Sequence, residues 1–265
     1  KHFRSKHAAI LNISPDHLER HKSIADYAKI KTKIFIAQQK NDYSYVSSSN
    51  KYSKLIYDNL KIKSKLIKVD KKYCNSLLKK INNKYLHNEG NQENVSFAYK
   101  IAKNFKLKNS VIIKALNSFK GLPHRQEIVF SNKKNICIND SKATSFDASL
   151  QSLKNYNKIY WIVGGLSKYK DHFNLNEVSK NIIKAYIIGK ETNFFSKQLK
   201  NKIPYTTSYN LKNAINNIYD DINRNNQEYF TILFSPAAAS YDQFNNFEDR
   251  GLYFKNLIKK KMKKI

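Results

Sequence analysis

The chain has 265 residues, 41% of them hydrophobic and 13% aromatic, which is enough to bury the cores of two domains and argues against a disordered protein. It contains no run of about 18 apolar residues and no recognisable signal peptide, so we expect no membrane association. Two cysteines, Cys74 and Cys137, predict neither a disulfide framework nor a metal site, and we expect a reduced, cytoplasmic protein.

The net charge of +29 is the strongest compositional signal. Clustered cations would favour a nucleic-acid partner, because they release counterions from phosphates. Here the lysines are scattered over almost every segment, and only five of the 49 basic residues are arginine, the residue of bidentate base and phosphate recognition. We interpret the charge as a solvated lysine-rich surface, and a basic nucleic-acid-binding module is the alternative from a different class.

Periodicity predicts alternating strands and helices along the chain. In the first part we expect a strand over 8–13, a helix from Ser23, which has capping-box spacing to Asp26, short strands and turns over 42–70, and helices over 91–105 and 110–119. A junction follows at Gly121-Leu122-Pro123. Beyond it we expect strands over 136–139, 159–163, 185–188 and 230–234, and helices over 145–155, 174–184, 193–200, 210–223 and 247–261. This alternation predicts a largely parallel sheet that is covered on both faces.

Three polar loops follow strands of the second part, and in such a sheet ligands bind beyond the carboxyl ends of the strands. The loops are Asn139-Asp140-Ser141-Lys142-Ala143-Thr144, Gly164-Gly165-Leu166-Ser167-Lys168 with Asp171 beyond it, and Ser235-Pro236-Ala237-Ala238-Ala239-Ser240-Tyr241-Asp242. Lys142 and Lys168 would present ammonium groups there, and Thr144 and Ser240 would add hydroxyls. This combination favours a site for an anionic, carboxylate-bearing small molecule.

Lys31 is unusual within its predicted helix. One stripe of that helix is apolar and consists of Ile24, Tyr27, Ala28 and Phe35. Lys31 lies in the middle of this stripe, where a cation is costly unless it is paired, neutralised or modified. Periodicity leaves two interpretations open, and it favours outward extension of the aliphatic stem over a functional role.

Two other residues are open to a functional or a structural interpretation. His17 stands in a Pro-Asp-His turn before the predicted helix, where a capping or structural role is the ordinary interpretation. Arg125, next to the junction, supplies a cation that suits either a structural role or phosphate binding. The chain contains no GxxxxGKS or GxxxxGKT sequence and therefore no P-loop.

Taken in order, these stretches resemble the Mur ligases that add D-glutamate. The matching stretches are Asn12-Ile13-Ser14-Pro15-Asp16-His17-Leu18-Glu19-Arg20-His21, then residues 27–35, 121–125, 139–144, 164–168 and 235–251. The resemblance runs from the first residues to about Phe254. It implies an ATP-dependent ligase of peptidoglycan synthesis that adds D-glutamate to UDP-N-acetylmuramoyl-L-alanine through an acyl phosphate.

The resemblance also implies an α/β architecture of two parts. Residues 1–120 would be the remainder of a P-loop-type central ATPase domain that lacks its P-loop, and residues 121–265 a Rossmann-like, doubly wound C-terminal domain that binds the amino acid. The implied cofactors are ATP and two Mg²⁺ ions, and the implied substrates are UDP-N-acetylmuramoyl-L-alanine and D-glutamate. We expect a monomer for the full-length enzyme, with no membrane or specific nucleic-acid partner.

Site residues follow from the same resemblance. Lys31 would become carbamylated and, with His17, serve the magnesium site, which reverses the preference from periodicity. Asn91, Asn94, Arg125 and Asp140 would contact the nucleotide. D-glutamate would be held by Lys142, Thr144, Lys168, Ser240, Tyr241 and Phe247.

The sequence departs from the family pattern at several positions. Ala238 replaces a usual cysteine, Ser167 and Tyr169 replace an acidic residue and a glycine beside Lys168, and Gly90 replaces a histidine. The family's uridine-nucleotide domain and P-loop would lie upstream of Lys1, so we expect this chain alone to have no ligase activity. A sister Mur ligase or a folylpolyglutamate-type ligase is the alternative among enzymes.

Overall fold

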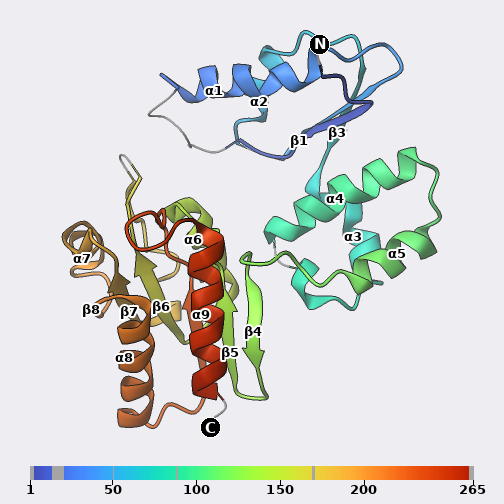
Figure 1. The fold of residues 1–265 in the computed structure, drawn as a ribbon. Helices are drawn as coiled ribbons and strands as arrows, with labels where there is room; N and C mark the ends of the chain where they lie inside the picture. The colour runs from blue at the N-terminus through green and yellow to red at the C-terminus, as the bar shows by residue number, and fades with distance from the viewer. Residues whose placement is uncertain (1–2, 14–20, 50, 88, 169–170, 263–265) are drawn as a thin grey trace. The chain divides into compact units, whose positions relative to one another are not determined.

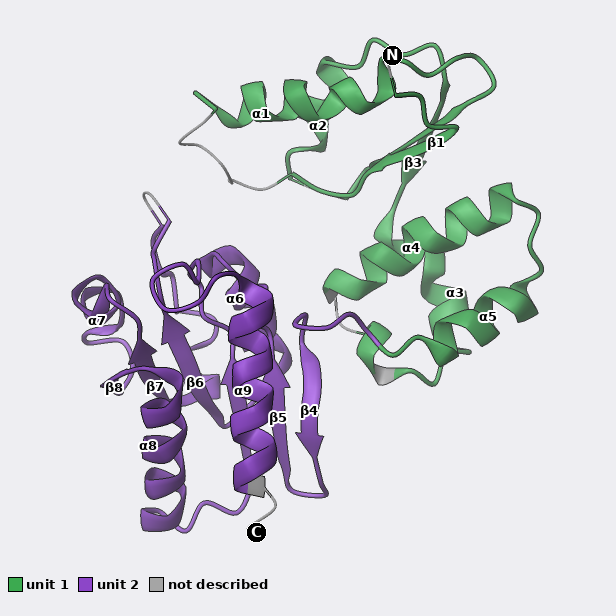
Figure 2. Ribbon diagram, in the orientation of Figure 1, with its two compact units in different colours: residues 1–120 green, residues 121–265 purple. Residues whose placement is uncertain are grey.

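The structure, a computed structural model, describes residues 3–13, 21–49, 51–87, 89–168 and 171–262. It divides into two compact units, unit 1 (Lys1–Lys120) and unit 2 (Gly121–Ile265), which are coloured separately in Figure 2. No helix among the described residues is both long and apolar enough to cross a membrane.

Unit 1 is built on a parallel sheet with the strand order β1-β2-β3. The strands are β1 (His7–Ile10), β2 (Tyr43–Ser47) and β3 (Lys65–Val69). The α-helices are α1 (Ile24–Lys31), α2 (Ser53–Asp58), α3 (Asn75–Leu78), α4 (Glu89–Asn104) and α5 (Asn109–Ser118), and the 3₁₀ helices are η1 (Thr32–Phe35), η2 (Lys71–Cys74) and η3 (Lys84–His87). Phe35 and Ile56 pack on one face of the sheet and Phe97 on the other, so η1 and α2 cover one face and α4 covers the opposite one.

The start of α1 follows the predicted cap. The backbone N–H of Asp26 donates to Ser23 Oγ at 3.1 Å, and that hydroxyl donates to the Asp26 carboxylate at 2.8 Å. The helix ends at Lys31, and η1 continues the chain to Phe35. Because a 3₁₀ helix has fewer residues per turn than an α-helix, the residues after Lys31 no longer follow α-helical spacing.

Lys31 lies beside the buried stripe of this segment. The buried positions are Ala28, Thr32 and Phe35, whereas the side chain of Lys31 is exposed. Its Nζ stands 5.2 Å from the centroid of the Tyr27 ring. The prediction that Lys31 lies in the middle of the buried stripe is therefore wrong, because the buried face is narrow and centred on Ala28 and Thr32. The outward extension that periodicity favoured agrees with this exposure.

Unit 2 contains one mixed sheet with the strand order β4-β5-β9-β6-β7-β8. The strands are β4 (Glu127–Ser131), β5 (Asn135–Asn139), β6 (Ile159–Gly164), β7 (Ile182–Ile188), β8 (Tyr205–Tyr209) and β9 (Phe230–Phe234). The helices are α6 (Phe146–Asn155), α7 (Thr192–Leu199), α8 (Leu211–Arg224), α9 (Phe247–Met262) and the short 3₁₀ helix η4 (Ser179–Asn181). Only β4 is antiparallel to its neighbour among these pairings, so the prediction of a largely parallel α/β sheet is confirmed.

Helices cover both faces of this sheet. Side chains of α6 and α7 belong to one apolar cluster, and those of α8 and α9 belong to the cluster on the opposite face. Figure 1 shows α8 and α9 side by side over their face. The chain leaves β5 and β6 toward the first face, and it leaves β9, which lies between them, toward the second. The strand order thus changes direction around β9, and this is where open α/β sheets bind ligands.

The helix predicted over 174–184 is absent. Leu175, Val178 and Ile182 are buried with helical spacing, but the N–H of Asn176 donates to Asn174 Oδ1 at 3.2 Å. This local side-chain bond competes with helix formation, and β7 already begins at Ile182. The strands β4 and β8 were not predicted, because both lie at sheet edges and are only partly buried.

Candidate active site

The three loops after β5, β6 and β9 meet at the carboxyl edge of the unit 2 sheet. The N–H of Asp140 donates to Phe234 O at 2.7 Å, which joins the first loop to β9. Leu166 and Ala239 exchange two backbone hydrogen bonds of 3.0 and 2.9 Å, which join the loops after β6 and β9. The structure therefore brings together the segments from which the sequence predicts an anion site.

Glycine is required where these loops touch. Gly165 has a φ of +139°, and a Cβ there would lie 2.3 Å from Ala239 O. Gly164 has a φ of +126°, and its Cβ would lie 2.0 Å from Ile188 O. A side chain at Gly165 would force the loops after β6 and β9 apart, and a side chain at Gly164 would force the end of β6 away from β7, so both close approaches require glycine.

Arg250, on α9, ties two of the loops together from within. Its Nη2 donates to Ser141 O at 2.8 Å and to Ala238 O at 3.0 Å, and its Nε donates to Ser141 Oγ at 3.1 Å. The side chain is 1% exposed, and burial lowers the pKa of the guanidinium to about 10, so it stays charged near neutral pH. Its Nη1 has no hydrogen-bond partner in the described part of the chain. The sequence predictions did not include Arg250, although an arginine in so lysine-rich a chain was a usable signal.

Asp140 is buried in a hydrogen-bond network beneath the edge. One carboxylate oxygen accepts from Ser152 Oγ at 2.6 Å and Ser235 Oγ at 2.9 Å, and the other accepts from Gln126 N at 3.1 Å. Burial raises the pKa of Asp140 to about 6, and these donors, together with the charge of Arg125, limit the rise. Both oxygens are thus engaged within unit 2.

Lys142 and Phe247 are in direct contact. The Nζ of Lys142 lies 3.7 Å from the centroid of the Phe247 ring, and the edge of His124 approaches the same ring with a centroid distance of 6.2 Å. Asn139 Nδ2 donates to His124 Nδ1 at 2.9 Å and to Gly251 O at 3.3 Å. Asn139 is fully buried and was missed as a site residue, yet it links β5 to α9.

Glu127 completes this cluster on the side of β4. It accepts hydrogen bonds from Lys255 Nζ and from the backbone N–H of His124. Burial pushes the pKa of Glu127 upward, but those two hydrogen bonds outweigh burial and leave the pKa below its usual range. Burial lowers the pKa of His124, which favours the neutral ring that accepts from Asn139.

The remaining predicted D-glutamate residues differ in exposure. Ser240 is 2% exposed, and its backbone carbonyl accepts from Gln243 N and Phe244 N. Tyr241, next to it, is 72% exposed. Thr144 and Lys168 are half-buried at the same edge. The candidate site thus combines half-buried cations with hydroxyls, although the hydroxyl of Ser240 is largely covered.

The predicted nucleotide and metal residues of unit 1 are spread over two segments. Asn91 Nδ2 donates to Tyr85 O at 2.7 Å, and the exposed Asn94 donates to Asn91 Oδ1 at 3.4 Å. His17 lies outside the described residues, and Lys31 is exposed. No cluster of three or more metal-binding side chains occurs within the described ranges. Arg125 of unit 2 is exposed.

Comparison with known proteins gives a consistent result. Residues 1–117 match the Mur ligase middle domain family. The chain is 33% identical to the UDP-N-acetylmuramoylalanine–D-glutamate ligase of Rickettsia felis, over 100% of this chain and 63% of that protein. It is 35% identical to the protein of the same name from Rickettsia prowazekii, over 98% of this chain and 62% of that protein. The chain therefore spans about three fifths of the length of these curated relatives.

Solved structures agree at the level of the fold. The MurF ligase of Thermotoga maritima, solved in complex with ADP, matches with a TM-score of 0.67 over 97% of this chain and 63% of that chain, at 13% identity. Such low identity shows a shared fold alone. The matched middle domain and the relatives that align along both units make this chain similar to the Mur ligases along its whole length.

Proposed function

We propose that this chain provides the D-glutamate-binding part, and a share of the ATP and magnesium site, of a UDP-N-acetylmuramoylalanine–D-glutamate ligase. The enzyme would use ATP to join D-glutamate to UDP-N-acetylmuramoyl-L-alanine in the cytoplasm. Two curated relatives that align with nearly the whole chain bear this name. The MurF ligase of Thermotoga maritima was solved with ADP, which supports a nucleotide site in this fold.

The observation that carries the proposal is the meeting of cations and hydroxyls at the carboxyl edge of the unit 2 sheet. Lys142 is fixed against Phe247, and the loops that bear Lys168 and Ser240 are hydrogen-bonded to each other. D-glutamate has two carboxylates and one amine. We assign its carboxylates to Lys142 and Lys168, and we assign Thr144 and Tyr241 to the polar rim of the site, with the buried Ser240 beneath it.

We assign nucleotide and magnesium binding to unit 1, with Asn91 and Asn94 toward the nucleotide. The exposed ammonium of Lys31 can lose a proton and add through its nitrogen to carbon dioxide, which gives a carbamate and releases H⁺. A carbamate oxygen and a His17 nitrogen would supply only part of the Mg²⁺ coordination shell. Mg²⁺ commonly keeps water and substrate phosphates as its other ligands. When bound, two Mg²⁺ ions would neutralise phosphate charge during phosphoryl transfer.

Amino-acid selectivity tests the proposal. The 265-residue chain, labelled with ¹⁵N, is titrated with D-glutamate, L-glutamate, L-alanine and meso-diaminopimelate, and backbone amide shifts are followed. We expect saturable shifts in residues 139–144 and 164–168 with D-glutamate, and at least about tenfold weaker binding of the others, a difference of about 1.4 kcal/mol.

Two lysine variants sharpen this test. Lys142→Ala removes a proposed ligand, whereas Lys197→Ala removes one charge from an exposed position on α7. We expect weaker D-glutamate binding only for Lys142→Ala. Preference for another amino acid would indicate a sister ligase, and equal affinities of the two variants would refute the assignment of Lys142.

A further inference from the structure

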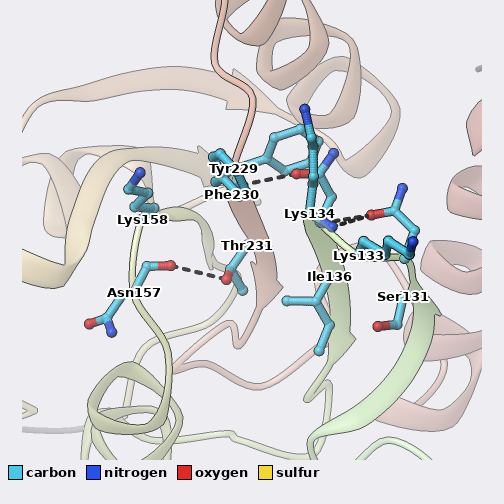
Figure 3. Close-up of a pocket in the computed structure, with 11 residues that line it drawn as sticks. Ser131, Lys133, Lys134, Ile136, Asn157, Lys158, Tyr229, Phe230 and Thr231 are labelled. Atoms are coloured by element: carbon cyan, nitrogen blue, oxygen red, sulfur yellow. Dashed lines mark hydrogen bonds between the residues drawn. The ribbon is translucent and has the colours of Figure 1, made fainter.

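Unit 2 has a cavity at the opposite edge of its sheet from the candidate active site. It measures about 370 Å³ and lies where β5 and β9 begin and β4 ends (Figure 3). The turn between β4 and β5 and residues 157–158 before β6 supply most of its polar lining. This volume is in the range of small-molecule sites.

The cavity is lined by positive charges, and in the described segments only one of them is paired with a carboxylate. Lys133, Lys134 and Lys158 line the cavity, and no carboxylate does. Lys134 pairs with Glu228 just outside at 3.0 Å, and both side chains of that pair are largely exposed. Within the described ranges, Lys133 and Lys158 have no acidic partner. The cavity therefore suits an anion.

An aromatic ring stands among these cations. The Tyr229 ring centroid lies 5.4 Å from Lys134 Nζ and 5.4 Å from Lys158 Nζ, so lysines from two different turns converge on it. The tyrosine is 49% exposed. A half-exposed ring beside cations provides a stacking surface for a planar base, next to charges for a phosphate.

Hydrogen bonds fix the turn before β6 that bears Lys158. Lys158 has a φ of 50°, a left-handed conformation that is disfavoured for a residue with a Cβ. Its carbonyl accepts from Thr231 N at 3.0 Å, and Thr231 Oγ1 donates to Asn157 O at 3.0 Å. Backbone outliers of this kind persist only where their surroundings fix them, and they are concentrated at functional sites.

The turn between β4 and β5 is fixed in a similar way. Asn132 Oδ1 accepts from Lys134 N at 2.9 Å and from Asn135 N at 2.7 Å. Asn135 Oδ1 in turn accepts from Phe230 N at 3.1 Å, which binds this turn to β9. The cations are thus presented by backbone segments that are already ordered, which lowers the entropy cost of ligand binding.

We propose that this cavity binds a nucleotide, with its phosphate between Lys133 and Lys158 and its base stacked on Tyr229. Its residues are different from those assigned to D-glutamate and ATP, and the proposal does not depend on those assignments.

An NMR titration of the 265-residue chain with AMP tests this proposal. We expect saturable shifts of the Lys134, Lys158 and Thr231 amides. Adenosine and inorganic phosphate, which each supply half of the ligand, bind at least about tenfold more weakly. Shifts confined to unit 1 or to residues 139–144 would overturn the proposal, and so would equal affinity for inorganic phosphate.

Substitutions distinguish the contribution of the lysine charges to AMP binding from that of the Tyr229 ring. Lys158→Asn removes the charge and tolerates the left-handed backbone, so the fold is kept. Combined with Lys133→Ala, it should weaken AMP binding roughly tenfold, because charge-assisted hydrogen bonds are lost. Tyr229→Leu should weaken AMP but not phosphate, whereas Tyr229→Phe retains both. Lys212→Ala, at an exposed position of α8, is the charge-matched control, and an equal loss there would overturn the site.

Discussion

The ammonium of Lys142 lies 3.7 Å from the centre of the Phe247 ring, so the loop after β5 and the first turn of α9 meet through a cation and an aromatic face. The ring also contacts the edge of His124, which is held by the amide of Asn139. Because His124 holds the Phe247 ring in place, the ring in turn fixes the position of the Lys142 ammonium. The geometry of the candidate site therefore depends on residues that need not touch the substrate.

Phe247→Leu tests this contact. Loss of the ring removes a cation–π interaction of about 0.5–1 kcal/mol and frees the Lys142 side chain. We expect D-glutamate to bind roughly three- to tenfold more weakly by NMR titration, with a smaller effect for Phe247→Tyr, which keeps the ring. Unchanged affinity in Phe247→Leu would show that the contact does not position the lysine.

Arg250→Lys should destabilise unit 2. The variant loses the two Nη2 hydrogen bonds to Ser141 O and Ala238 O and leaves a buried ammonium in their place. We expect a loss of about 2–4 kcal/mol in the free energy of unfolding, measured by urea denaturation. Arg224→Lys is the control, because the Arg224 side chain is 75% exposed. Similar midpoints for both variants would contradict the role of Arg250 as a tie between loops.

Asp140 should make the stability of unit 2 fall as the pH rises. Burial raises the pKa of Asp140 to about 6, whereas in the unfolded chain it has an ordinary value near 4. Between about pH 4 and pH 6 the folded state binds more protons than the unfolded state, so the free energy of unfolding decreases with increasing pH in this window. The decrease attributable to Asp140 is at most about 3 kcal/mol.

The measurement is urea denaturation at pH 4 and pH 7. We expect Asp140→Asn to lack this part of the pH dependence, because the amide does not titrate. Asp220→Asn, at an exposed position of α8, should follow the parent chain. If the profiles of the parent chain and Asp140→Asn run parallel, the raised pKa is refuted.

Gly251→Ala should be destabilising although Gly251 is within a helix. Alanine normally stabilises a helix interior by about 0.5–1 kcal/mol relative to glycine. Here the new Cβ would lie 2.2 Å from His124 Nδ1, so the histidine ring must move. We expect a lower thermal midpoint, partly restored when His124→Ala is added. Gly90→Ala, at an exposed position of α4, is the control and should not lower the midpoint.

The sequence was most informative where burial and local periodicity agree. Strands β6 and β9 are buried along their whole length, and both were predicted. Strand β8, with the sequence Tyr-Thr-Thr-Ser-Tyr, lies at the sheet edge and has no such signal. The position of β9 between β5 and β6 could not be predicted either, since strand order depends on contacts between distant segments.

The site residues also differ in whether local sequence or contacts between distant segments reveal them. Lys142 and Phe247 came from loop motifs and a family resemblance, and the structure places them in contact. Arg250 and Asn139 were missed because their importance lies in buried hydrogen bonds that join segments more than a hundred residues apart. Lys31 was expected in the middle of the buried stripe of its helix, but the buried face is narrow and centred on Ala28 and Thr32, so Lys31 lies beside it and is exposed.

The central position of β9 also dictates how unit 2 can assemble. Strand β9 is the last of the described strands in the chain, yet it lies in the middle of the sheet. Until residues 230–234 pair with their neighbours, β4-β5 and β6-β7-β8 are therefore two separate sheets with open edges. A growing polypeptide thus carries the loops after β5 and β6 before it contains the strand that joins their sheets. Such late, long-range pairing slows folding and leaves unpaired edges exposed to aggregation. The carboxyl edge becomes a single surface only when β9 closes the sheet.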